Sequence, residues 1–277
     1  MEFFMINKLR NKWNSKIYVI SISFLLFISC KFVSDPLQTE PELKELPSIS
    51  VDWDSTHSIV CFGTSLTYGL IWEGLDPVYL QKTNYYSLIK NNDLNSSFFY
   101  TRADSAYPKC LDNRLKIKVY NQGYPGATVN SAISYLADSV LTKNPSLVLL
   151  EFSANDFLRK RDVSTTREEM IELIDSISNF GSKIVLISFV DEYTINHPPK
   201  DHLLYDQREL AKEYYLMLKD IANEYNLLFI NDCFLGIFGH TDLMCDDIHP
   251  NNEGYIKMAE NIYKSLYKTF KINNMLK

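Results

Sequence analysis

The chain has no excess of basic residues, because its 28 Lys and Arg are outnumbered by 34 Asp and Glu, and its formal net charge is −6. Proteins that bind nucleic acid usually carry a basic surface, so we expect no nucleic-acid partner. Glycine and proline are also few, 9 and 10 among 277 residues, which excludes a collagen-like or low-complexity chain. With 46% hydrophobic residues, the sequence predicts an ordinary globular protein with one main domain and a sizeable core.

Cysteine is scarce too, and none of the five cysteines belongs to a CxxC pair or to a His/Cys cluster with the spacing of zinc ligands. We therefore expect no metal site and no cofactor. An exported protein can pair two of Cys61, Cys110, Cys233 and Cys245, and the sequence does not choose which.

The N-terminus lacks an apolar run long enough to span a bilayer. Four basic residues precede an apolar segment of 12 residues, 17–28. Twelve residues rise about 18 Å as a helix, whereas a membrane span needs about 20 residues. The pattern favours an export signal over a transmembrane helix.

The segment Phe27-Ile28-Ser29-Cys30 resembles a bacterial lipobox, in which the cysteine is lipidated and becomes the mature N-terminus. We therefore expect a lipoprotein of the bacterial cell envelope, anchored to the membrane through Cys30 on the periplasmic or the cell-surface side. An ordinary cleaved signal and a retained anchor are the alternatives. Residues 31–56 contain three prolines and no apolar periodicity, which predicts a flexible tether after the signal peptide, 1–30, and before a folded domain, 57–277.

From residue 57 onward, compact apolar runs alternate with helical patterns. The expected strands are residues 58–62, 115–120, 147–152, 183–189 and 227–230. The expected helices are residues 129–141, 167–180, 207–225 and 250 to about 270. Such alternation is typical of an α/β protein, and it predicts a three-layer α/β/α doubly wound parallel five-stranded sheet with right-handed crossovers.

In doubly wound sheets, ligands bind beyond the carboxyl ends of the strands. Four loops at this edge contain polar groups that can react or donate hydrogen bonds. Ser65 follows the first strand, Gly126 the second and Asn155 the third, while Asp246 and His249 follow the last. A hydroxyl, a glycine turn, a carboxamide and an acid with a histidine are the components of an acyl-transfer site.

The four loops, in this order, resemble the sequence blocks of the SGNH (GDSL-type) hydrolases, which are esterases and acyl hydrolases with a flavodoxin-like fold. The resemblance covers about residues 59–255. It departs from the family pattern at Thr64, where Asp is usual, and at Ser153, where Gly is usual. The GxSxG elbow of α/β-hydrolases is absent from the sequence, which argues against that other fold.

The resemblance implies a role for each of these residues. Ser65 would be the nucleophile, His249 the general base and Asp246 the acid that orients the histidine. The backbone N–H groups of Ser65 and Gly126, with the amide of Asn155, would form the oxyanion hole. We also expect Pro250 to be the first helical residue and to direct His249 back toward the sheet edge.

Each of these residues also has a non-catalytic interpretation. Ser65 can cap a helix, and Gly126 can belong to a type II turn after proline. Asn155 can cap a turn, and His249 can be a structural histidine at a helix start. Asp247 is the rival of Asp246 as the orienting acid.

The expected function is that of a serine esterase or acyl hydrolase, which cleaves an acetyl or other acyl ester of an envelope glycan, a lipid or a small molecule. An O-acyltransferase with the same site, a non-catalytic surface-binding lipoprotein and a flavodoxin-like nucleotide binder are the alternatives. The aromatic-rich stretch 70–114, which contains Trp72, can stack on sugars but is more simply explained by packing. Residues 191–204 can form a lid over the site.

Overall fold

The central sheet is parallel and has five strands. The computed structural model describes residues 58–73, 99–200 and 202–270. The five strands are β1 (Ser58–Gly63), β4 (Lys118–Gly123), β5 (Pro145–Glu151), β6 (Lys183–Ile187) and β7 (Leu228–Ile230). They pair in the order β4-β1-β5-β6-β7, and every pair is parallel, so the predicted five-stranded sheet is confirmed. Cys30 and the expected tether lie outside the described residues and stay predictions.

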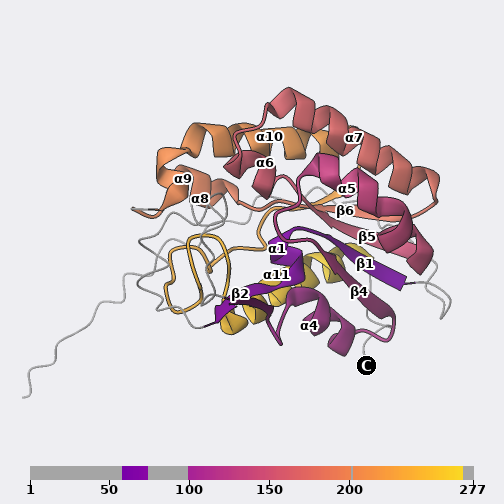
Figure 1. Ribbon diagram of the computed structural model, residues 1–277, viewed down its shortest axis with the longest axis horizontal. Helices are drawn as coiled ribbons and strands as arrows, with labels where there is room; N and C mark the ends of the chain where they lie inside the picture. Colours follow the sequence, from indigo (N-terminus) through magenta and orange to yellow (C-terminus); the bar gives the residue numbers. More distant parts are fainter. Residues whose placement is uncertain (1–57, 74–98, 201, 271–277) are drawn as a thin grey trace, which may run out of the picture. The chain divides into compact units, whose positions relative to one another are not determined.

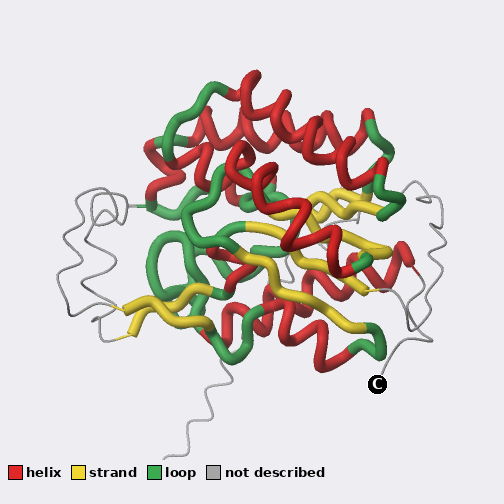
Figure 2. Tube along the Cα trace, turned by 45° about the vertical axis from the view of Figure 1, so that its right-hand side comes forward, coloured by secondary structure: helices red, strands yellow, loops and turns green. Residues whose placement is uncertain are grey.

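Helices cover both faces of this sheet. Figure 1 shows α5, α7 and α10 on one face and α4 and α11 on the other, and Figure 2 shows the strands between these two helical layers. The bounds of these helices are α4 (Tyr107–Arg114), α5 (Val129–Tyr135), α7 (Val163–Asn179), α10 (Arg208–Glu224) and α11 (Asn252–Phe270). Every residue of β1 is buried, as expected for a parallel strand that is covered on both sides.

The strand order brings together the loops in which the sequence analysis found candidate site residues. The sheet begins at β1, adds β4 on one side and then continues with β5 on the other. The carboxyl ends of β1, β4 and β5 therefore flank the point at which the strand order reverses, and this is where doubly wound sheets bind ligands.

Two helices begin or end differently from the sequence prediction. The helix expected over residues 129–141 ends at Tyr135 and continues as a π turn, Leu136–Val140, and a 3₁₀ turn, Leu141–Lys143. The helix expected from residue 167 begins one turn earlier, at Val163, because Asp162 caps it by accepting a hydrogen bond from the Thr165 N–H at 2.8 Å.

The prediction that Pro250 opens the last helix is wrong. Pro250 forms an isolated antiparallel bridge with Met244, and α11 begins only at Asn252. Asn251 makes the transition, because its side-chain oxygen accepts a hydrogen bond from the Gly254 N–H at 3.0 Å. Backbone pairing, and not a helical position, thus holds Pro250 extended next to His249.

The stretch 70–114 contains elements that the sequence did not predict. Strands β2 (Leu70–Glu73) and β3 (Phe99–Arg102) pair antiparallel as a separate two-stranded sheet. Helix α4 follows them. Residues 74–98, between the two strands, lie outside the described residues.

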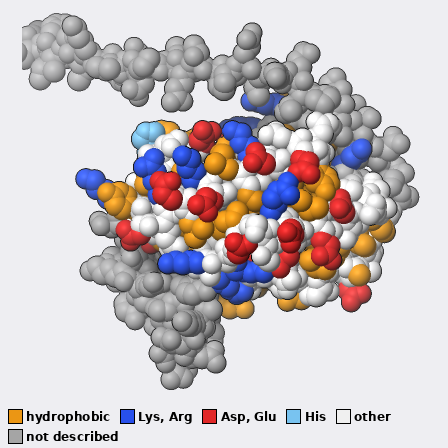
Figure 3. All heavy atoms as spheres, turned by 90° about the horizontal axis from the view of Figure 1, so that it is seen from above, with side chains coloured by type: hydrophobic (Ala, Val, Ile, Leu, Met, Phe, Trp, Pro, Cys, Tyr) orange, Lys and Arg blue, Asp and Glu red, His pale blue; other side chains and the backbone are white. Residues whose placement is uncertain are grey.

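The short helices α8 (Glu192–Asn196) and α9 (Leu203–Asp206) occupy the segment in which a lid was expected. None of the helices that the structure describes is both long and apolar enough to cross a membrane. In Figure 3, acidic and basic side chains are interspersed on the face that includes α7 and α10, and one ion pair, Arg167 with Glu224, joins these two helices.

Candidate active site

Ser65 is the first residue of α1 (Ser65–Tyr68), which follows β1 directly. The helix is capped by the preceding residue, because the Thr64 hydroxyl accepts a hydrogen bond from the Leu66 N–H at 3.4 Å. The alternative interpretation of Ser65 as the helix cap is therefore wrong. Its own hydroxyl makes a different contact, to a histidine from the other end of the chain.

Three side chains form one line of hydrogen bonds. His249 Nε2 lies 2.8 Å from Ser65 Oγ, and His249 Nδ1 lies 2.7 Å from Asp246 Oδ2. The three residues are only 6%, 1% and 4% exposed in the order Ser65, His249, Asp246. The structure thus brings together a hydroxyl, an imidazole and a carboxylate in a site that is almost closed to water.

The Asp246 carboxylate accepts four hydrogen bonds. Oδ1 accepts from the backbone N–H groups of Ile248 at 2.7 Å and His249 at 2.6 Å. Oδ2 accepts from the His249 ring and from Trp72 Nε1 at 2.8 Å. Burial alone would raise the pKa of this carboxyl, but the charge of His249 and its hydrogen bonds lower the pKa below its usual range.

The hydrogen bond to Asp246 determines which nitrogen of the neutral His249 ring carries the proton. An ionised carboxylate can only accept hydrogen bonds, so Nδ1 of His249 carries a proton. In the neutral ring, Nε2 is then an acceptor, and it faces the Ser65 hydroxyl. This is the protonation state in which an imidazole can remove a proton from a serine.

Asp247 faces a different histidine. Its carbonyl oxygen accepts a hydrogen bond from His202 Nε2 at 2.5 Å. Burial raises the pKa of the Asp247 carboxyl, while the charge of His202 and a hydrogen bond from the Leu203 backbone lower it. The structure therefore places Asp246, and not Asp247, against the ring of His249.

Gly126 lies in a tight turn after β4. Its φ is +77°, and the Ala127 N–H donates to the Tyr124 carbonyl at 3.0 Å, as in a type II turn with Pro125 at the second position. The side chain of Asn155, on α6 (Ala154–Leu158), reaches this turn and donates from Nδ2 to the Ala127 carbonyl at 2.9 Å. The turn interpretation and a role in catalysis are thus compatible.

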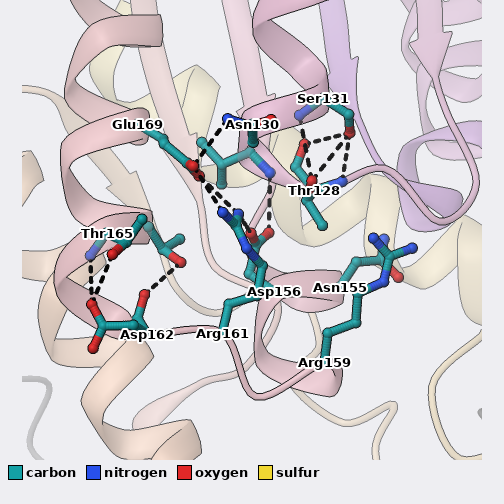
Figure 4. Close-up of polar contacts among 12 residues, drawn as sticks. Thr128, Asn130, Ser131, Asn155, Asp156, Arg159, Arg161, Asp162, Thr165 and Glu169 are labelled. Atoms are coloured by element: carbon teal, nitrogen blue, oxygen red, sulfur yellow. Dashed lines mark hydrogen bonds and ion pairs between the residues drawn. The ribbon is translucent and has the colours of Figure 1, made fainter.

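Arg159, just after α6, fixes the same turn from outside. Its exposed guanidinium donates to the Gly126 carbonyl at 2.7 Å. Figure 4 shows the side chains of Asn155 and Arg159 next to each other. In the described part of the chain, no group accepts a hydrogen bond from the backbone N–H of Ser65 or Gly126.

A partly buried ion-pair network anchors α6 (Figure 4). Asp156, next to Asn155, accepts hydrogen bonds from the Val129 N–H at 3.1 Å and from Arg161 at 2.5 Å. Arg161 also pairs with Glu169 on α7 at 2.8 Å. The network joins α5, α6 and α7, so it fixes Asn155 relative to the turn at Gly126. The sequence prediction did not include Asp156 or Arg161.

Another polar group that the prediction missed lies beneath Ser65. The buried carboxyl of Glu151, at the end of β5, accepts hydrogen bonds from Thr64 Oγ1 at 2.9 Å and from Thr67 Oγ1 at 3.0 Å. Burial raises the pKa of Glu151 to about 7, although these bonds lower it. Gly63 is required here, because a Cβ on it would lie only 2.2 Å from Thr67 Oγ1 and 2.7 Å from the Glu151 carboxyl.

Thr64 and Ser153, the two departures from the family pattern, have different structural consequences. Thr64 both caps α1 and binds Glu151, so it is well accommodated. Ser153 has a φ of +93°, a left-handed value that favours glycine. Its buried hydroxyl has no hydrogen-bond partner among the described residues, so the usual glycine would fit this position with less strain.

An apolar cavity that is partly open to solvent lies beside the site. Its walls include Leu66, which follows Ser65, and Ala154, which precedes Asn155. Phe157, Phe189 and Phe238 contribute aromatic rings, and Leu203 and Leu204 of α9 complete part of the wall. The segment expected to form a lid thus lines this cavity with its C-terminal end.

The described residues contain no group of three or more His, Cys, Asp or Glu that could hold a metal ion. The four cysteines among them, Cys61, Cys110, Cys233 and Cys245, are all free thiols.

The chain is similar to known hydrolases in both sequence and structure. Residues 61–256 match the GDSL-like lipase/acylhydrolase family, whereas no curated protein matches the chain. The psychrotrophic esterase EstA from Pseudoalteromonas sp. is 21% identical, with a TM-score of 0.51 over 78% of this chain and 98% of that one. The lipase/acylhydrolase from Enterococcus faecalis is 22% identical, with a TM-score of 0.50 over 79% of this chain and 97% of that one. At these identities, the structural likeness shows the fold.

Proposed function

On the premise that the chain belongs to the GDSL-like lipase/acylhydrolase family and hydrolyses ester bonds, we propose that it does so through an acyl-enzyme on Ser65. The observation that carries the proposal is the unbroken line of hydrogen bonds from Ser65 through His249 to Asp246. Such a line is the arrangement that activates a serine hydroxyl in acyl transfer.

The first half of the reaction transfers the acyl group to the enzyme. As Ser65 Oγ attacks the carbonyl carbon, its proton moves to His249 Nε2, and Asp246 stabilises the imidazolium that forms. The tetrahedral intermediate then expels the alcohol, whose oxygen takes the proton back from Nε2. In the second half, water loses a proton to His249 and attacks the Ser65 ester, which releases the acid and restores the hydroxyl.

The negative oxygen of the tetrahedral intermediate needs donors that are already in place. We assign this role to the N–H groups of Ser65 and Gly126 and to the amide of Asn155. The Asn155 amide nitrogen has two N–H groups, and the hydrogen bond to Ala127 uses one of them. This bond fixes the plane of the amide, so the second N–H has a set direction.

The acyl chain is the part of the substrate on which the structure bears most directly. The apolar cavity beside Ser65 and Asn155 supports an aliphatic acyl group. The test is hydrolysis of nitrophenyl acetate, butyrate and octanoate by the purified chain. Activity on at least one ester supports the proposal, provided a fluorophosphonate abolishes it and labels Ser65. Failure to cleave any of the three esters would contradict it.

Removal of the Asn155 amide is expected to slow the reaction without unfolding the protein. Asn155→Ala should lower kcat by about 100- to 1000-fold with little change in KM, because the amide acts mainly on charge that develops in the transition state. Steady-state kinetics with a nitrophenyl ester give both constants. Asn223→Ala, on the exposed surface of α10 and away from this network, is the matched control. A normal kcat in Asn155→Ala would reduce Asn155 to a residue that holds the turn.

We further propose that the protein acts at the bacterial cell envelope, anchored as a lipoprotein through Cys30, on ester groups of envelope glycans or lipids. The basic N-terminal residues, the short apolar run and the Cys30 that follows support this location.

The Cys30→Ser variant tests the anchor. If Cys30 carries the lipid, the variant should lose incorporation of a fatty-acid label and leave the membrane fraction, because the acyl chains supply the membrane affinity. Labelling followed by membrane fractionation measures both effects, and Cys61→Ser serves as the matched control. Equal labelling of Cys30→Ser and the unaltered chain would rule the anchor out.

A further inference from the structure

The indole of Trp72 reaches the acid of the proposed triad from a part of the chain that lies outside the four sequence blocks. Its Nε1 donates to Asp246 Oδ2 at 2.8 Å, across 174 positions of sequence. The same Oδ2 accepts the hydrogen bond from His249 Nδ1. The indole N–H and the imidazole N–H thus share one carboxylate oxygen.

The other donors to this carboxylate differ from Trp72 in origin. The N–H groups of Ile248 and His249 and the ring of His249 all belong to the loop that carries Asp246 itself. Trp72 lies on β2, and of the four donors it alone ties the loop to another element. The loop is also held from outside at the Asp247 carbonyl, by His202, but the indole is the donor from another element that contacts the Asp246 carboxylate itself.

Strand β2 is well suited to this purpose, because it is held on several sides. It pairs with β3, with Trp72 opposite Tyr100, and the two rings pack edge to face at 6.2 Å. The buried Tyr255 hydroxyl of α11 donates to the Leu70 carbonyl at 3.0 Å. A hydrogen bond from the Trp72 backbone also lowers the pKa of the Cys245 thiol, which burial raises overall. Figure 1 shows β2 next to α11.

We propose that Trp72 is a positioning residue of the catalytic triad, which holds Asp246 Oδ2 in line with His249 Nδ1 and withdraws part of its negative charge. The proposal rests on the serine mechanism proposed above. Trp72 touches neither the serine nor the reacting carbonyl in this mechanism, so its effect passes through Asp246. If Trp72 only filled space at this position, removal of its indole N–H would not change kcat or the pH profile.

The Trp72→Phe variant tests the N–H, because it keeps an aromatic ring and removes the donor. We expect kcat to fall about tenfold with KM nearly unchanged, because Asp246 is held less firmly in line with His249. This loss is much smaller than the roughly 10⁴-fold loss of kcat that follows when the orienting acid itself is removed. Without the indole N–H, Asp246 stabilises the protonated imidazole more strongly. The acid limb of the kcat profile should therefore move to higher pH, by about half a unit.

The other titratable groups near the Asp246 carboxylate are unaltered in this variant. They are His249 on the same loop, the neighbouring pair of Asp247 and His202, and the Cys245 thiol. The charged group of β3, Arg102, contacts the Tyr68 ring at 4.2 Å. A shift of the pH profile therefore reports the loss of the indole donor.

Tyr100→Leu is the matched control, because it removes the ring that packs on Trp72 and keeps the donor. We expect its kcat and pH profile to match those of the unaltered chain. If Trp72→Phe does not fold, benzothienylalanine at position 72 replaces the N–H by sulfur in a ring of nearly the same shape. An unchanged kcat and pH profile in the folded donor-free variant would overturn the proposal, as would an equal loss in Tyr100→Leu without a shift of the profile.

A second readout separates this proposal from the proposed function. The Nδ1 proton of His249 should give a far-downfield proton NMR signal, because it lies in a short bond to a carboxylate, and the signal should move in Trp72→Phe and stay in Tyr100→Leu. This measurement needs no turnover. A chain that hydrolyses no ester but shows the shift would contradict the proposed function, while it would still show that Trp72 orients Asp246 against His249. A signal that does not move would overturn the positioning role.

Discussion

Ser65→Ala and His249→Ala are each expected to lower kcat by about 10⁶-fold, and the double variant is expected to lose hardly more than either single variant. A serine hydroxyl without a base is a poor nucleophile, and a base without its hydroxyl has no proton to remove. Because His249 Nε2 and Ser65 Oγ lie 2.8 Å apart, the two groups act as one unit and their losses should not add. Steady-state kinetics on a nitrophenyl ester measure all three variants.

Two controls make this experiment decisive. A fluorophosphonate should label Ser65 in the unaltered chain and nothing in Ser65→Ala. His240→Ala removes an exposed histidine that takes no part in this line of hydrogen bonds, so it should retain most of the activity. Full activity in Ser65→Ala would refute the serine mechanism, and additive losses would show that His249 acts independently of Ser65.

Asp246→Asn is expected to lower kcat by about 10⁴-fold, whereas Asp247→Asn should change it little. An amide in place of the Asp246 carboxylate can donate a hydrogen bond to His249 Nδ1, which favours the wrong tautomer, and it cannot stabilise the imidazolium. Asp247 has neither function, because it lies beside His202 and the Leu203 backbone. The two substitutions have the same chemistry one residue apart, so each is the control for the other.

The pH dependence adds a second test of this assignment. The pKa of Asp246 is lowered in the folded protein, so its carboxylate stays ionised above that low value and is protonated only as the pH falls through it. Across the neutral and mildly acidic range, Asp246 should therefore add no ionisation of its own to the profile of kcat/KM against pH. A larger loss in Asp247→Asn than in Asp246→Asn would overturn the choice of acid.

Local sequence patterns accounted for the sheet well because a buried parallel strand is apolar on both faces. The runs at residues 58–62 and 147–152 correspond to β1 and β5 within two residues at either end. No strand or helix was predicted in residues 70–114. Strands β2 and β3 are only four residues each, and their pairing depends on a partner far along the chain. Short strands give little periodic signal.

Helix ends were less predictable for a related reason. Apolar spacing indicates which face of a helix is buried, but the first residue depends on which side chain caps it. Asp162 starts α7 one turn before the expected residue, and Asn251 delays the start of α11 beyond Pro250. Both outcomes depend on single hydrogen bonds that spacing does not encode.

The sequence by itself determined the order of the strands along the chain and the positions of Ser65, Gly126, Asn155 and His249 in the loops and helix starts that follow them. These are local properties, because a strand end and a turn are encoded by neighbouring residues. Sequence order also requires that these loops meet at one edge of a parallel sheet.

Only the tertiary structure decided which side chains orient and support the acid. The family resemblance favoured Asp246 over Asp247, but the direction of each carboxylate depends on the donors that surround it in the fold. Trp72 and Glu151 reach the site across 174 and 87 positions, respectively. Contacts over such distances exist only once the chain has closed around its core, because no local pattern specifies the partner of a buried polar group.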